Sequence, residues 1–241
     1  MINKKETLGI HLLELRRRLI WCLISVLVTT IIAFIFHNPI LHFLMIPAQG
    51  AQSPLGLPIY TDLTEFVGAA IRVSLTSGIV LAWPLIMYQL AVFILPGLKP
   101  QEKKYVYFFL PISTIVFFIG AYFGYKVLFP PAVNFLLHFG ADVAVPYIRI
   151  GNYTNLMLTL ILWMGISFEM PIIVFFLSLV GIVTPKLLIK GRRYAVVCAF
   201  IMGAIITPTF DPVNQSIVAL PLIVLYEAGI LLSRIGSKRK K

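Results

Sequence analysis

The chain has 241 residues, of which 59% are apolar and 12% are charged, and its mean hydropathy is +0.95. This composition excludes a water-soluble domain and predicts an integral membrane protein. The net charge of +11 does not indicate nucleic-acid binding, because all Lys and Arg residues except Arg72, Lys126 and Arg149 lie in segments that we expect to face the cytoplasm and its anionic lipid.

The first charged segment, residues 11–18, is predicted to be the amphipathic end of a helix that continues into an apolar run, residues 19–36. Three consecutive arginines, residues 16–18, place this end in the cytoplasm by the positive-inside rule. The apolar run is too long for a removed signal peptide and lacks a small-residue cleavage site, so we expect it to remain as an anchor.

The apolar periodicity predicts an all-α membrane protein, with one domain over residues 1–241 and both termini in the cytoplasm. A loop rich in Pro, Gly and Ser is expected from His37 to Asp62, and Pro130-Pro131 is expected to end the third span. The six predicted transmembrane helices cover residues 19–36, 66–93, 105–129, 156–180, 194–208 and 213–233.

The last two spans contain short apolar runs, residues 194–206 and 217–232. A run of 13 residues covers about 20 Å of a hydrocarbon core that is roughly 30 Å thick. Either these helices extend through polar residues such as Asn214 and Gln215, or the bilayer is thinner beside them. Asp211 is expected to cap the last helix, with Pro212 at its first position.

Small residues and prolines interrupt the apolar runs. Prolines 84, 111, 171 and 221 lie inside spans, where each removes a backbone hydrogen bond, so we expect bent helices and a partly open surface. Gly120 and Gly124 form a small-residue packing motif, which fits packing inside the subunit and packing against a partner equally well.

Glu169 lies near the centre of the fourth span. A charged carboxylate there costs roughly 2.5–3.5 kcal/mol on insertion scales, so this group is expected to be protonated, hydrogen-bonded or exposed to water. Glu169 is either a neutral acid that is hydrogen-bonded to a neighbouring helix for structural reasons or a residue with a role in the protein's function.

Two carboxylates, Glu14 and Glu102, lie among the cations of the cytoplasmic side. Two carboxylates can hold two guanidinium groups bidentately, a geometry that lysine does not reproduce. Each residue also has a structural explanation, because Glu14 can pair with Arg18 one turn later and Glu102 can complement the dipole of its helix.

These residues belong to a series of motifs whose order and spacing resemble the TatC family, the polytopic subunit of the twin-arginine protein translocase. Two departures are Lys99-Pro100-Gln101 in the loop before Glu102 and an extra residue before Asp211. The motifs are His11-Leu-Leu-Glu14-Leu-Arg16; Pro47; Pro84-Leu-Ile-Met-Tyr88-Gln89; Phe93-Ile-Leu-Pro96 with Glu102; Tyr125 and Pro130; Ser167-Phe-Glu169-Met-Pro171; Gly203-Ala-Ile-Ile-Thr207-Pro208; and Tyr226-Glu227.

The resemblance implies a multi-pass protein of the cytoplasmic membrane that receives twin-arginine signal peptides of folded proteins. It implies that Glu14 and Glu102 hold the arginine pair and that Arg16 and Phe93 shape the site. It also implies a cupped shape with Glu169 on the concave face, Pro47 in the outer loop that caps it, and Asp211 as a partner-binding position. The implied partners are the single-span subunits TatA and TatB and further copies of the chain, and the proton-motive force supplies the energy.

Two other functions compete with this one. A secondary transporter could use Glu169 as a proton site, but the chain has a single central acid in its spans and no detectable internal repeat. An intramembrane enzyme is disfavoured because the sequence lacks paired aspartates, Gly-x-Ser-x-Gly, His-Glu-x-x-His and Cys-x-x-Cys. We expect no cofactor and no metal.

Overall fold

The computed structural model describes residues 4–47, 58–95, 100–139, 148–207 and 211–238, without the side chains of residues 4–12, 94, 100–102 and 238. Within these residues every regular element is a helix, which confirms the all-α prediction, and one isolated bridge pairs Ile59 with Arg149. The helices are α1 (Lys4–Ile35), α2 (His37–Met45), α3 (Glu65–Ile94), α4 (Pro100–Phe123), the π-helix η3 (Gly124–Leu128), α5 (Phe129–His138), α6 (Ile150–Phe168), α7 (Met170–Val180), α8 (Pro185–Ile206) and α9 (Pro212–Lys238).

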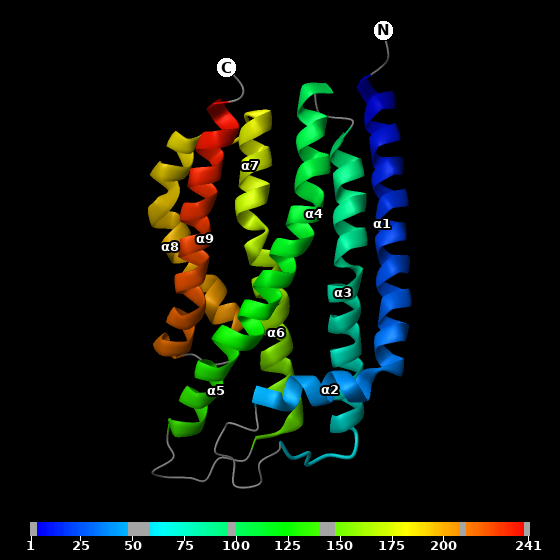
Figure 1. Cartoon of the computed structure of the whole chain (residues 1–241), viewed down its shortest axis with the longest axis vertical. Coiled ribbons are helices and arrows are strands. Elements are labelled where there is room, and N and C mark those ends of the chain that lie inside the picture. The colour runs from blue at the N-terminus through cyan, green and yellow to red at the C-terminus, as the bar shows by residue number, and fades with distance from the viewer. Residues whose placement is uncertain (1–3, 48–57, 96–99, 140–147, 208–210, 239–241) are drawn as a thin grey trace.

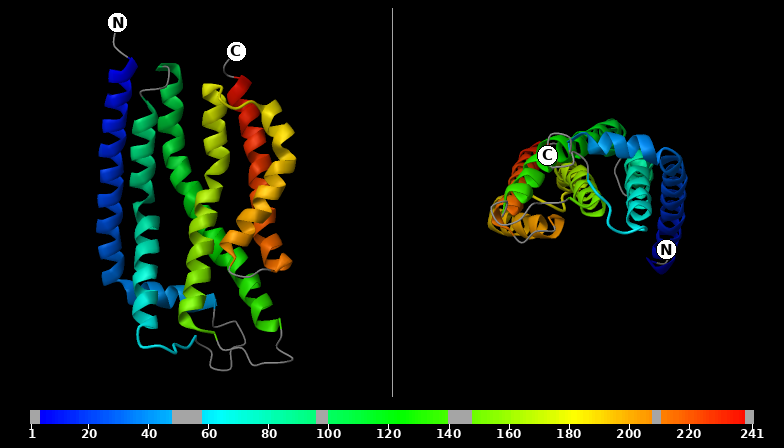
Figure 2. Two further views of the ribbon diagram at one scale, coloured as in Figure 1. Left: turned by 180° about the vertical axis from the view of Figure 1, so that it is seen from behind. Right: turned by 90° about the horizontal axis from the view of Figure 1, so that it is seen from below.

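The long helices form a curved row with α1 at one end and α8 at the other (Figures 1 and 2). In this row α1 packs along α3, α4 packs along α6, and both α7 and α8 pack along α9. Both termini lie at the same end of the molecule (Figure 1), as an even number of membrane crossings requires. The row therefore has the concave shape that was expected.

Five helical stretches in the described part of the chain are long and apolar enough to cross a membrane. The helix α8 has 22 residues, or about 33 Å, but Lys186, Lys190, Arg192 and Arg193 occupy its first half. The helix α9 has 27 residues and includes Asn214 and Gln215, so the last helix extends through polar residues. The five stretches are Leu13–Ile35, Glu65–Phe93, Lys103–His138, Ile150–Val180 and Pro212–Ser237.

The prediction of a loop from His37 to Asp62 is partly wrong, because residues 37–45 form the helix α2. This helix crosses the base of the row (Figure 1). Leu41, Leu44 and Met45 are buried at helical spacing. Pro39 is the third residue of α2, where a helix needs no backbone donor. The hydroxyl of Tyr125 donates to the Phe43 carbonyl at 2.8 Å and thereby ties α2 to η3.

Of the four prolines expected to bend their helices, Pro171 lies at a break, because α6 ends at Phe168 and α7 begins at Met170. Pro84, Pro111 and Pro221 lie inside continuous helices, and Pro130-Pro131 stands in the first turn of α5 instead of ending the third span. The long helical stretch of the third span changes from α4 to the π-helix η3 at Gly124–Leu128 and continues as α5. The fourth span is broken at Glu169, between α6 and α7.

The glycine motif is used inside the subunit. A Cβ atom at Gly120 would lie 2.7 Å from the Met164 carbonyl oxygen, and one at Gly124 would lie 2.6 Å from the Leu160 carbonyl oxygen. The absence of side chains at both positions thus lets α4 and η3 approach the backbone of α6 closely.

Predicted helix ends are confirmed at three positions. Gly181 ends α7 with a φ of 88°, in the left-handed region that favours glycine. The Thr184 hydroxyl accepts from the Leu187 amide at 3.4 Å, and the Asp211 carboxylate accepts from the Asn214 amide at 2.6 Å.

The helices α1 and α3 approach each other closely at Gly78. A Cβ atom added there would lie 2.7 Å from both the amide nitrogen and the Cα atom of Thr30. The Thr29 hydroxyl donates to the Gly78 carbonyl at 2.8 Å. This glycine therefore determines how near α1 can lie to the rest of the protein.

We expect Gly78→Ala to destabilise the protein by about 1–3 kcal/mol, because the added methyl group meets backbone atoms that cannot rotate away. Thermal unfolding in detergent micelles measures the effect. The matched control is Gly68→Ala in the same helix, where a Cβ atom would have no neighbour within 4 Å. A melting temperature lowered equally by both variants would contradict the close α1–α3 contact.

Candidate functional site

A groove of about 600 Å³ lies between α1 and α3, at the end of the molecule where the chain begins. Both helices contribute side chains at successive helical turns, so one stripe of each helix faces the groove. Its wall combines a carboxylate, two guanidinium groups, an amide and two aromatic rings. The lining residues are Leu13, Glu14, Arg17, Arg18, Trp21, Tyr88, Gln89 and Val92.

Glu14 forms an ion pair with Arg18 at the edge of this groove. The Arg18 Nη2 and Nε atoms lie 2.5 Å and 3.2 Å from the Oε1 atom of Glu14. The Arg18 Nη1 atom lies 3.4 Å from the amide oxygen of Gln89, so the same guanidinium connects α1 to α3. The predicted pairing within one turn is present, and it occurs beside an open groove.

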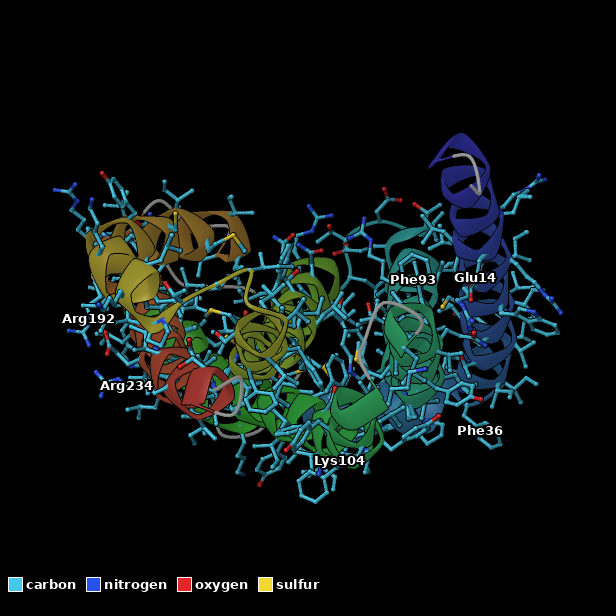
Figure 3. All side chains as sticks on the ribbon, turned by 90° about the horizontal axis from the view of Figure 1, so that it is seen from above. Glu14, Phe36, Phe93, Lys104, Arg192 and Arg234 are labelled. Atoms are coloured by element: carbon cyan, nitrogen blue, oxygen red, sulfur yellow. The ribbon has the colours of Figure 1, made fainter. Side chains whose placement is uncertain are left out.

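The other predicted site residues are distributed around this end. Phe93 is half-buried on α3, next to the helix that carries Glu14, and Arg16 is exposed on α1 (Figure 3). The backbone of Glu102 belongs to the first turn of α4, but its side chain lies outside the described residues. The structure therefore brings Glu14 and the α3 residues together and leaves the distance to the Glu102 carboxylate untested.

Sequence reasoning had not assigned Arg18, Trp21 or Gln89 to the site. The signal was available, because Glu14, Arg18 and Trp21 are separated by four and three residues and so share one face of a helix. Tyr88 and Gln89 were noted only as part of a family motif. Which face of α3 meets α1 depends on tertiary packing, so the pattern alone did not identify that wall.

Glu169 lies at the break between α6 and α7 and is only 3% exposed. Its Oε2 atom accepts a hydrogen bond from the Ser113 hydroxyl at 2.7 Å, and its Oε1 atom accepts one from the Trp83 indole at 3.3 Å. Both oxygens of the carboxyl group are thus satisfied by side chains of α4 and α3. The hydrogen bonding to neighbouring helices that the sequence predicted is therefore present, with side chains as the donors.

Aromatic packing holds the Trp83 donor in position. The Trp83 ring stacks on Phe117 with centroids 3.8 Å apart and an interplanar angle of 13°. Phe117 is fully buried, and a Cβ atom at Gly165 would lie 2.6 Å from its ring. The polar contact at Glu169 is therefore built into a close-packed junction of α3, α4 and α6.

The two remaining predicted positions lie away from the groove. Pro47 is half-buried in a short turn after α2. Asp211 precedes α9, where its carboxylate accepts from the backbone amide and the side-chain amide of Asn214. Asp211 therefore has a structural role as the cap of α9.

Glu227 on α9 forms an ion pair with Arg192 on α8, with 2.7 Å between Nη2 and Oε2. Both side chains are exposed. This ion pair lies at the opposite end of the curved row from Glu14 (Figure 3).

Comparison with known proteins gives one consistent result. Residues 10–221 match the family model described as Sec-independent protein translocase protein (TatC). The chain is 34% identical to the Sec-independent protein translocase protein TatC of Carboxydothermus hydrogenoformans, over 97% of this chain and 95% of that protein. It is 38% identical to the protein of the same name from Aquifex aeolicus, over 96% of each chain.

A solved structure has nearly the same fold. The crystal structure of the twin arginine translocase receptor TatC superposes with a TM-score of 0.84, at 37% identity over 94% of this chain and 99% of that one. The same receptor in DDM gives a TM-score of 0.85 at 38% identity, over 92% of this chain and 99% of that one. The chain therefore belongs to the TatC family, as a membrane-embedded subunit of the Sec-independent protein translocase and not an enzyme.

Proposed function

We propose that the groove between α1 and α3 receives the twin-arginine segment of a signal peptide. The observation that carries the proposal is the Glu14 carboxylate, which lines an open groove together with Tyr88 and Trp21. A guanidinium group is planar, can bond a carboxylate through two parallel donors and stacks on aromatic rings. An ammonium group has the same charge without this geometry, so such a groove favours arginine over lysine.

Other predicted residues enter this proposal with separate roles. Glu102, in the first turn of α4, supplies the second carboxylate for the arginine pair, and Phe93 and Arg16 shape the edge of the site. Pro47 belongs to the outer loop that caps the concave face, and Asp211 is a partner-binding position. TatA and TatB dock along the later helices, further copies of the chain join the complex, and the proton-motive force drives transport of folded proteins.

The role proposed for Glu169 follows from its position at the junction of α3, α4 and the broken α6–α7 element. A buried carboxyl group in a membrane protein marks a functional site more often than a polar residue elsewhere does. We propose that this junction must keep its hydrogen bonds for transport to proceed. A proton-coupled transporter remains the alternative, and substrate-coupled proton flux in liposomes that contain this subunit alone would favour it.

We expect Glu14→Gln to weaken binding of a twin-arginine peptide by about tenfold or more, because a hydrogen bond to a charged group contributes about 1.5–3 kcal/mol. Glu14→Asp should lose less, since it keeps the charge. Photocrosslinking of a labelled signal peptide to the membrane-embedded protein measures the loss. The control is Glu227→Gln, which removes another exposed carboxylate paired with an arginine. Equal crosslinking in Glu14→Gln and the unmodified protein would count against the assignment.

Glu102→Gln should also weaken crosslinking, while the protein stays inserted and stable. If both carboxylates hold one arginine pair, the combined loss in the Glu14→Gln/Glu102→Gln variant should differ from the sum of the single losses, in free-energy units. Titration of the peptide against all four proteins measures this coupling. Strict additivity would mean that the two groups act at separate places.

Ser113→Ala should lower the free energy of unfolding by about 1–3 kcal/mol, since it leaves a buried carboxyl oxygen without its donor. It should also reduce export if the Glu169 junction takes part in transport. Ser178→Ala is the matched control, because Ser178 is a buried serine bonded to the Ser233 hydroxyl at 2.6 Å on α7 and α9. Export assays at matched protein levels compare the two, and the same export in both would leave Ser113 with a purely structural role.

A further inference from the structure

The Arg18 guanidinium already occupies the carboxylate that the proposed function assigns to a ligand. Two of its nitrogen atoms, Nη2 and Nε, are bonded to the same oxygen of Glu14, Oε1. An oxygen of a carboxylate has about two acceptor sites. Both sites of Oε1 are therefore filled by the protein itself.

This arrangement restricts how an incoming group can bind. A guanidinium that binds side-on needs one acceptor site on each carboxylate oxygen. Arg18 occupies Oε1, and no described side chain donates to Oε2. A ligand can reach Oε2 end-on while Arg18 stays in place, but bidentate binding requires Arg18 to leave.

The same side chain is linked to the second wall of the groove. The Arg18 Nη1 atom lies 3.4 Å from the Gln89 amide oxygen on α3. Release of Glu14 by Arg18 would therefore also change a contact between α1 and α3. Arg18 is the better-protected partner of the pair, with 20% of its side chain exposed against 31% for Glu14.

We propose that Arg18 is an internal competitor that sets the affinity of the groove for adjacent arginines. This inference rests on the proposed function of Glu14. A guanidinium ligand that binds bidentately must displace Arg18, and the loss of the Arg18–Glu14 ion pair lowers its affinity. An ammonium ligand gains a single-point contact at Oε2 with Arg18 still bound, so Arg18 influences its affinity through charge alone.

The test uses the full chain in lipid nanodiscs and two synthetic signal peptides, one with Arg-Arg and one with Lys-Lys. Arg18→Met keeps an unbranched apolar side chain and removes the competing donors. Because partly exposed ion pairs are weak, we expect affinity for the Arg-Arg peptide to rise about threefold to fivefold. Arg18→Lys, which keeps the charge without the forked donors, should give a smaller rise for the same peptide.

The matched control is Arg17→Met, which removes an equal charge from the wall of the same groove. It should change the affinity of both peptides by the same factor, so it measures the general effect of charge. Arg18→Met should add to this effect for the Arg-Arg peptide only. In a Glu14→Gln background, replacement of Arg18 should give no gain beyond the effect of Arg17→Met.

The possible outcomes separate this inference from the proposed function. Weaker Arg-Arg binding in a stably folded Arg18→Met variant would overturn competition and show that Arg18 positions Glu14. Equal gains for both peptides, matching Arg17→Met, would also overturn it. If Glu14→Gln itself leaves Arg-Arg affinity unchanged, the proposed function fails, whatever Arg18 does.

Discussion

The contact between α1 and α3 is the constraint on which the candidate site depends. The helix α1 stands at the end of the curved row and packs along α3. The distance between the two helices is set by Gly78 in the middle of α3 and by the hydrogen bond from the Thr29 hydroxyl to the Gly78 carbonyl. Because the groove uses side chains of both helices about two to five turns from this point, its width follows from how the two helices meet there.

At several places polar side chains bridge separate helices. Glu169 joins α3, α4 and the α6–α7 break, Arg18 connects α1 to α3, and Ser178 is bonded to Ser233 between α7 and α9. In an apolar surrounding, association between helices comes from close packing and from such bonds instead of the hydrophobic effect. A membrane protein with an open, curved row of helices has few other contacts to fix the relative positions of its parts.

Much of the fold could be predicted from the sequence, because its signals are local. Apolar runs gave the long helices, and Gly181, Thr184 and Asp211 ended or began them as expected. The errors arose where packing overrides local signals. The segment His37-Asn38-Pro39 begins α2 because Leu41 and Leu44 are buried. Pro130 stands in the first turn of α5, so the helix of the third span continues past it. At the site, the Glu14–Arg18 pair followed from helical spacing, whereas Gln89, Trp83 and Ser113 come from elsewhere in the chain and required the tertiary structure.

The most direct test of the central claim, that ligand binds between α1 and α3, maps where a twin-arginine peptide lies. A photoreactive residue is placed at position 88 on α3 and, in a second protein, at position 194 on α8, where Tyr194 is similarly exposed. If ligand binds between α1 and α3, the Arg-Arg peptide forms an adduct at position 88, the Lys-Lys peptide forms a weaker one there, and neither forms one at position 194. An adduct at position 194 without one at position 88 would contradict this claim.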